Sequence, residues 1–109
     1  MKIAITSEGT DVDAAVDPRF GRCKYFLIFD LENACFEVIE NSHAQASGGA
    51  GIQAGQQMVS KGVSAVLTGH VGPNAAQILT PAGIKIHSGI TGKVSEVLER
   101  FKSGDLKTA

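Results

Sequence analysis

Residues 63–92 have the sequence VSAVLTGHVGPNAAQILTPAGIKIHSGITG, and this stretch decides the fold class. It holds a short apolar run at 63–67 and an alternating segment at 84–87, separated by a helical segment that begins at Pro73 and ends at Gly83. Proline suits a first helical turn because its missing N–H costs nothing there, and glycine commonly ends a helix. A strand–helix–strand unit requires parallel neighbouring strands joined by a right-handed crossover. The sequence therefore predicts an α/β protein.

Three further strands and two further helices complete the predicted fold. Apolar runs predict strands at 3–6 and 25–29, and a segment of mixed apolar and charged residues predicts an edge strand at 35–40. The short gap between the last two strands requires an antiparallel hairpin. Helices are predicted at 50–61, with Ile52, Met58 and Val59 at roughly helical spacing, and at 94–101. With the alternating strands at the edges, the sheet order is 3-2-1-4-5 with strand 2 antiparallel. We expect a three-layer, ribonuclease-H-like fold.

Length and composition limit the classes of protein to which the chain can belong. The 109 residues predict one domain over residues 1–109, and 10 basic against 11 acidic residues give a net charge of −1, which does not favour nucleic-acid binding. No apolar run approaches the ~20 residues that span a bilayer, and the segment after Met1 is too short for a signal peptide. Cys23 and Cys35 are too few for a disulfide framework. We expect a cytoplasmic protein with free thiols and no membrane partner.

A glycine turn recurs after two strands. Residues 68–72 (TGHVG) and 88–92 (SGITG) both have the pattern Ser/Thr-Gly-x-x-Gly just before a helix. Such turns can need glycine for tight geometry alone, or they can present N–H groups to an anion at a helix start. The second interpretation makes Gly69, Gly72 and Gly89 candidate binding residues. Gly49 and Gly51 are further candidates, since they would let the helix predicted at 50–61 start close to a bulky ligand.

Soft metal-ligating side chains are predicted to meet at the carboxyl edge of the sheet, where open α/β sheets bind ligands. Cys23 precedes strand 2, while His43 and His70 follow strands 3 and 4. Thiolate and imidazole suit iron, copper and sulfide-bridged metals. Each residue also has an ordinary explanation: a small buried hydrophobe for Cys23, a solvated loop residue for His43 and a polar cap for His70. His87 ends strand 5 and is a weaker candidate.

The expected ligand is a preassembled anionic cluster. The chain has no Cys-x-x-Cys pair and cannot supply four cysteines to an ordinary iron–sulfur centre. A site with few protein ligands suits a cluster that brings its own sulfide and later leaves. Arg19 and Arg22 flank Cys23 and would favour an anion, although they also fit an ordinary solvated loop.

Enzymatic alternatives are less favoured. A ribonuclease-H-type nuclease needs several carboxylates around two metal ions, whereas the candidates here, Glu8, Asp11, Asp13 and Asp17, lie in one loop. No serine or cysteine has both a base and an orienting acid placed by the sequence. We expect that the protein is not an enzyme.

The chain resembles the dinitrogenase iron–molybdenum cofactor biosynthesis family, which contains nitrogenase accessory factors, over roughly residues 1–106. The resemblance rests on Asp17-Pro18-Arg19-Phe20-Gly21-Arg22, Phe26-Leu27-Ile28-Phe29-Asp30, Gly49-x-Gly51, Thr68-Gly69-His70-Val71-Gly72-Pro73-Asn74-Ala75, Gly83-Ile84 and Gly89-Ile90-Thr91-Gly92, in that order.

The resemblance implies a ribonuclease-H-like fold and a carrier of an iron–molybdenum or other metal–sulfur cluster, or its precursor. The cluster, of iron and/or molybdenum, would be bound transiently and exchanged with a donor or recipient protein. Some members use a histidine just before Phe-Gly in cofactor binding; that position is Arg19 here, and Cys23, four residues later, is a candidate substitute. The alternative is a regulatory or interaction module that binds a protein or a small phosphorylated ligand without metal. The sequence leaves the oligomeric state open.

Overall fold

The computed structural model describes residues 1–42 and 49–104. Their elements follow the predicted order: β1 (Lys2–Ser7), β2 (Tyr25–Asp30), β3 (Cys35–Glu40), α1 (Ala50–Lys61), β4 (Ala65–Leu67), α2 (Pro73–Leu79), β5 (Lys85–His87) and α3 (Val94–Lys102).

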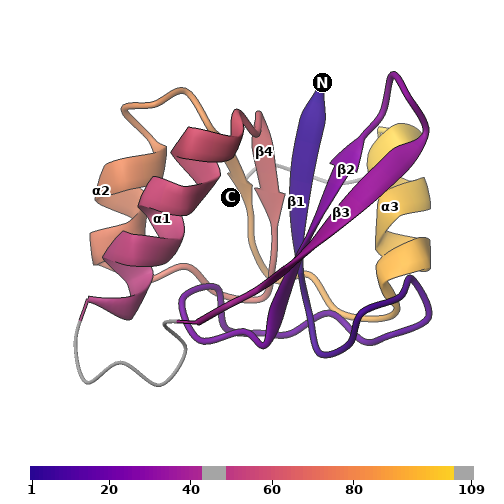
Figure 1. The fold of residues 1–109 in the computed structure, drawn as a ribbon, viewed down its shortest axis with the longest axis horizontal. Coiled ribbons are helices and arrows are strands. Elements are labelled where there is room, and N and C mark those ends of the chain that lie inside the picture. Colours follow the sequence, from indigo (N-terminus) through magenta and orange to yellow (C-terminus); the bar gives the residue numbers. More distant parts are fainter. Residues whose placement is uncertain (43–48, 105–109) are drawn as a thin grey trace.

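The strands form one five-stranded mixed sheet in the order β3-β2-β1-β4-β5, which confirms the predicted topology. β2 is antiparallel to both β1 and β3, and β4 is parallel to β1 and β5. α1 and α2 lie side by side over one face of the sheet, and α3 covers the other (Figure 1). The ribonuclease-H-like assignment stays a prediction.

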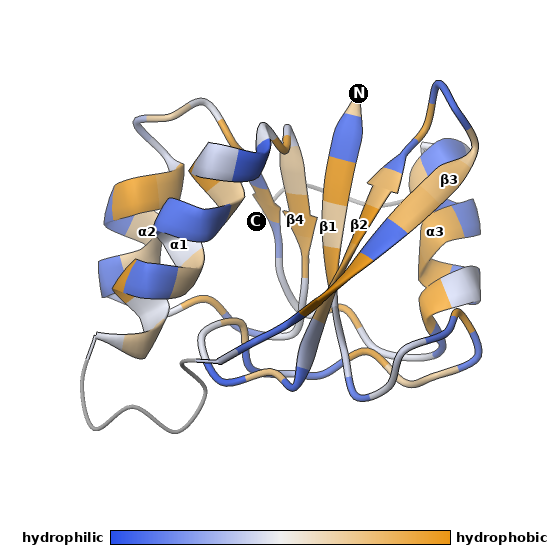
Figure 2. Cartoon of the chain, viewed as in Figure 1, coloured by the Kyte–Doolittle hydropathy of each residue, from blue (hydrophilic) through white to orange (hydrophobic). Residues whose placement is uncertain are grey.

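Alternation along the central strands divides the core between the two faces. In β1, Ala4 packs toward α1 and α2, while Ile3 and Ile5 pack toward α3. In β2, Phe26 packs toward α1 and α2, and Leu27 packs toward α3. Figure 2 shows hydrophobic residues along these strands between the two helical layers. Because both faces are covered, the central strands carry the nearly continuous apolar runs seen in the sequence.

α1 buries only one of the three apolar residues that lie at helical spacing in its sequence. Met58 is fully buried, but Ile52 and Val59 are 37% and 44% exposed. The other buried residues of the helix, Ala50, Ala54 and Gly55, are small, and a Cβ built on Gly55 would lie 3.0 Å from the Ile78 Cβ of α2. Close packing of α1 on α2 therefore selects small residues for the contact and leaves the two aliphatic side chains outside.

β3 confirms the expectation of an edge strand, since nearly all of its residues are exposed. Within residues 1–42 and 49–104, no helix combines the length and apolarity needed to cross a membrane.

Candidate functional site

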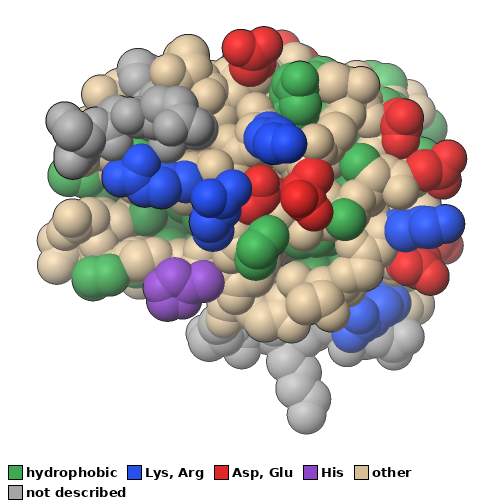
Figure 3. Space-filling view, turned by 90° about the horizontal axis from the view of Figure 1, so that it is seen from below, with side chains coloured by type: hydrophobic (Ala, Val, Ile, Leu, Met, Phe, Trp, Pro, Cys, Tyr) green, Lys and Arg blue, Asp and Glu red, His purple; other side chains and the backbone are tan. Residues whose placement is uncertain are grey.

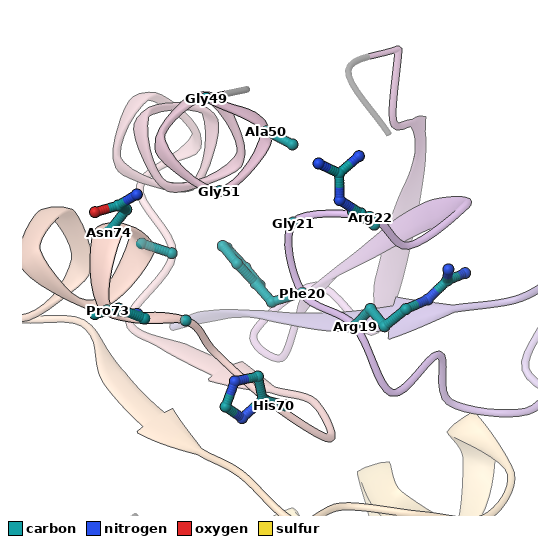
Figure 4. A pocket seen from close by; sticks show the side chains of 12 residues that line it. Arg19, Phe20, Gly21, Arg22, Gly49, Ala50, Gly51, His70, Pro73 and Asn74 are labelled. Atoms are coloured by element: carbon teal, nitrogen blue, oxygen red, sulfur yellow. The ribbon is translucent and has the colours of Figure 1, made fainter. Parts of the chain in front are cut away.

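A cavity opens at the carboxyl edge of the sheet. Pairing of Ser7 with Tyr25 and of Leu67 with His87 brings the ends of β1, β4 and β5 to the same edge as the start of β2. The cavity has a volume of about 430 Å³ and lies between the loop before β2 and the first turns of α1 and α2 (Figure 4). It is lined by Arg19, Phe20, Gly21, Arg22, Gly49, Ala50, Gly51, His70, Gly72, Pro73, Asn74 and Ala75.

One wall of the cavity is the loop at residues 17–22, which hydrogen bonds anchor to the sheet. The Thr6 hydroxyl donates to the Asp17 carbonyl oxygen at 2.6 Å, and the Asp17 N–H donates to the Thr6 carbonyl oxygen at 2.9 Å. The Phe20 N–H donates to the His70 carbonyl oxygen at 3.1 Å. This pairing brings Arg19 beside His70, from segments about fifty positions apart in the chain.

Glycine permits close contact beneath this wall. A Cβ built on Gly69 would lie 2.6 Å from the Pro18 Cα, and one built on Gly21 would lie 2.9 Å from the Gly51 Cα. Carbon atoms in favourable contact lie about 3.5–4.0 Å apart, so neither position admits a side chain without a shift of the main chain. Gly69 therefore allows the loop at residues 17–22 to pack closely against it, and it does not line the cavity.

The opposite wall is made by helix starts. α1 follows Gly49, whose φ of 75° is left-handed, and α2 follows Gly72; neither helix has a side-chain cap or an acidic residue in its first turn. The first N–H groups of a helix have no partner within it and carry partial positive charge. Because Ala50 and Gly51 line the cavity, the start of α1 gives this wall an electropositive character.

The side chains add to this positive character. Arg19 and Arg22 are exposed at the cavity, beside the uncharged donor and acceptor groups of His70, and no Asp or Glu occurs among its described lining residues. Viewed from this side, basic side chains and a histidine lie next to one another (Figure 3). Since the chain as a whole has a net charge of −1, this positive character is local. The cavity is suited to an anion.

Cys23, the predicted thiolate ligand, lies elsewhere. It is completely buried in the core between the sheet and the α1–α2 layer and is not part of the cavity lining. Asn41 Nδ2 approaches its sulfur at 3.9 Å. Burial, and secondarily the nearby charge of Asp17, raise the pKa of the Cys23 thiol far above its ordinary value of 9.0. In this structure Cys23 is thus a neutral core residue, as its ordinary explanation proposed.

The buried thiol predicts a specific loss of stability in alkali. The unfolded thiol ionises near pH 9.0 while the folded one stays protonated, so this contribution is complete below pH 9 and is lost as pH rises. The free energy of unfolding should fall by about 1.4 kcal/mol per pH unit above 9, relative to Cys23→Ala. Urea unfolding between pH 8 and 11 measures this difference. Cys35→Ala, at an exposed thiol, should keep the wild-type slope; equal slopes for wild type and Cys23→Ala would contradict the assignment.

The other predicted residues divide between the cavity and the scaffold. Arg19, Arg22, Gly49, Gly51, His70 and Gly72 all line the cavity. Gly89 does not, because its N–H donates to the Gly69 carbonyl oxygen at 2.8 Å and is therefore unavailable to a ligand. His87 packs edge-on against Phe101 of α3, with ring centroids 5.7 Å apart, on the other side of the sheet. His43 lies outside the described residues, so its predicted role stays a prediction.

Sequence reasoning did not single out Phe20, Pro73 or Asn74 as site residues, although all three line the cavity. Phe20 is only 1% exposed and forms part of the cavity floor. Their presence in the quoted family motifs was the only available signal. Within the two described ranges, no group of three or more His, Cys, Asp or Glu side chains is arranged to hold a metal ion. The described part of the cavity thus offers charge and hydrogen-bond donors, with a single imidazole as soft ligand.

Comparison with known proteins identifies the family of the chain. The model of the dinitrogenase iron-molybdenum cofactor family matches residues 1–104. The chain belongs to this family. A Desulfovibrio gigas relative, the orange protein in its apo form, has 40% sequence identity and a TM-score of 0.94, with 99% of this chain and 92% of that one covered.

Two further relatives support the assignment. A NifB-like protein from Thermotoga, solved by NMR, has 39% identity and a TM-score of 0.86, with 98% of this chain and 91% of that one covered. An uncharacterized protein of Methanocaldococcus jannaschii is 29% identical over 98% of this chain and 90% of its own length. Family and neighbours together suggest a role in the binding or biosynthesis of a metal-cluster cofactor.

Proposed function

We propose that this protein is a carrier that binds an anionic metal–sulfur cluster, or the precursor of one, in the cavity at the carboxyl edge of the sheet. The cargo would contain iron and/or molybdenum and would be passed between a donor and a recipient protein during cofactor assembly. Family membership and the orange-protein and NifB-like neighbours support the metal–sulfur theme.

One observation carries the proposal: the cavity wall combines Arg19, Arg22 and the start of α1, whose N-cap residue Gly49 has no side chain, and its described lining contains no carboxylate. Guanidinium groups and free main-chain N–H groups donate charge-assisted hydrogen bonds to anions. Sulfide ligands of a metal cluster bear negative charge and accept such bonds. At about 430 Å³, the space also lies within the range of small-ligand sites.

The ligand set favours transient binding. A resident iron–sulfur centre is normally held by four thiolates, whereas the described lining offers the imidazole of His70 and no thiol. A cluster held mainly by charge and hydrogen bonds can leave without several metal–protein bonds being broken. We assign no reaction to the cavity and propose that the protein is not an enzyme.

Anaerobic titration tests the proposal. Protein is mixed with thiomolybdate, or with iron, sulfide and molybdate, and bound metal is measured after gel filtration together with visible absorbance. We expect one saturable site, and we expect His70→Ala to weaken binding by about tenfold through loss of a hydrogen-bonding or ligating contact. His87→Ala is the matched control, since His87 lies on the α3 side of the sheet.

A colourless, metal-free protein under every condition would contradict the carrier function. Saturable binding of a sugar phosphate or nucleotide, in place of metal sulfide, would instead favour the alternative of a module for phosphorylated ligands, since phosphate uses the same donors. A loss of binding in His87→Ala equal to that in His70→Ala would place the site elsewhere.

A further inference from the structure

Asp17 is a buried charged residue for which the proposed carrier has no evident use. Its side chain is only 1% exposed. Oδ1 accepts the main-chain N–H of Arg19 at 3.0 Å and lies 3.4 Å from Nε of the same arginine. Oδ2 is buried, and no donor among the described residues reaches it. Burying a carboxylate with one oxygen unsatisfied is costly, so a purely structural role would be expected to use an uncharged residue.

The partner of Asp17 is one of the two arginines at the cavity. Figure 4 shows the two side chains in different directions: Arg22 extends along the rim toward Ala50, whereas Arg19 extends away from the cavity. The Arg19 side chain is 61% exposed. Among residues 1–42 and 49–104, the one polar contact of its side chain is the Nε–Oδ1 pair, whose 3.4 Å distance is near the limit of a hydrogen bond. Arg19 thus lines the cavity with its backbone side, while one weak contact among the described residues holds its guanidinium turned away from the cavity.

We propose that Asp17 is a positioning residue that holds Arg19 away from the empty cavity, and that an anionic ligand draws the Arg19 guanidinium off Asp17 and into contact with itself. The inference rests on the proposed function and adds a regulatory feature to the same site.

The energetic balance allows this exchange. The pair joins a buried carboxylate to an exposed guanidinium through a single contact of 3.4 Å. Solvent around the guanidinium weakens this contact, and holding the long arginine side chain costs conformational freedom. A ligand with several negative charges, next to Arg22 and the start of α1, offers the guanidinium a stronger partner. Asp17 keeps the main-chain N–H of Arg19 when the side chain leaves, so its carboxylate retains one donor.

Two consequences follow for a carrier. Part of the binding free energy is used to separate Arg19 from Asp17, so singly charged anions are disfavoured relative to a multiply charged cluster. When the cargo is withdrawn, Asp17 offers Arg19 its resting partner again, which favours release to a recipient.

The test compares Asp17→Asn with wild type in thiomolybdate binding. The asparagine Oδ1 still accepts the Arg19 N–H, but the charge that holds the guanidinium is gone. We expect the affinity to rise about fivefold, mainly through slower dissociation. Asp13→Asn, an exposed carboxylate in the same loop region, is the matched control and should leave the affinity unchanged.

Removal of a negative charge could raise affinity without any movement of Arg19, and a double-mutant cycle separates the two causes. In an Arg19→Ala background the Asp17→Asn gain should disappear. A gain of the same size without Arg19 overturns the proposal. If Asp17→Asn does not fold, Asp17→Ser is used instead, because a serine hydroxyl can also accept the N–H two residues later.

A second readout is independent of affinity. The ¹⁵N NMR signal of the Arg19 Nε–H should differ between free wild type and free Asp17→Asn. When thiomolybdate saturates the wild type, this signal should move away from its position in the free wild type. Identical signals in the two free proteins overturn the positioning role while leaving the carrier function intact. Absence of any thiomolybdate binding contradicts the carrier function and the release of Arg19, but leaves the free-state contact measurable.

Discussion

Arg19→Ala/Arg22→Ala is expected to weaken thiomolybdate binding by about 100-fold while the fold remains intact. Each arginine supplies charge-assisted hydrogen bonds, which contribute ~1.5–3 kcal/mol apiece, and tenfold in affinity corresponds to about 1.4 kcal/mol. Both side chains are exposed, so their removal creates no cavity in the core. Isothermal titration calorimetry under anaerobic conditions measures the change, and circular dichroism confirms the fold.

Arg100→Ala is the control for this pair, since Arg100 is an exposed arginine on α3, on the other side of the sheet. It should bind like wild type. Raising the salt concentration should weaken binding to wild type more than to the double variant, because salt screens the charges that the variant lacks. Wild-type affinity in the double variant would show that the positive wall does not bind the ligand.

Gly69→Ala is expected to cost about 3 kcal/mol of stability and to displace the wall of the cavity. The added Cβ would lie 2.6 Å from the Pro18 Cα and 2.7 Å from the Pro18 carbonyl oxygen. Both are main-chain atoms, so no side-chain rotation relieves the clash. The segment that carries Arg19 must move, and ligand binding should fall with stability. Urea denaturation followed by circular dichroism gives the first quantity, and titration gives the second.

The same turn supplies a matched substitution. Gly72 has an ordinary φ of −72°, and a Cβ built there has no neighbour within 4 Å. Gly72→Ala should therefore change stability by no more than about 0.5 kcal/mol. If Gly69→Ala were as stable as Gly72→Ala, the close contact with Pro18 would not hold the loop.

The sequence predicts the sheet because its signals are local. The hairpin at residues 25–40 and the turn glycines of the strand–helix–strand units limit the topology to one strand order, and apolar runs distinguish the covered central strands from the exposed edge. The sequence predicts less well which residues of a helix face the core. Ile52 and Val59 fit a buried stripe by spacing alone, but the short distance between α1 and α2 reserves the contact for small residues.

The candidate site is predictable to the level of the sheet edge and no further. Position in the chain brings Cys23 to that edge, but only packing decides that its side chain is directed into the core. Gly89 likewise lies in the expected turn, yet its N–H is used by the Gly69 carbonyl. Asp17 is one of four acidic residues in a polar loop, and nothing in the spacing distinguishes the buried one from the others.

The most direct test of the central claim is the position of molybdenum in crystals grown with thiomolybdate, located by anomalous scattering at the molybdenum edge. We expect a single strong peak in the cavity, within contact distance of the Arg22 side chain, His70 and the first turn of α1. A peak on another face of the molecule, or an empty cavity in crystals of a protein that binds molybdenum in solution, would contradict it.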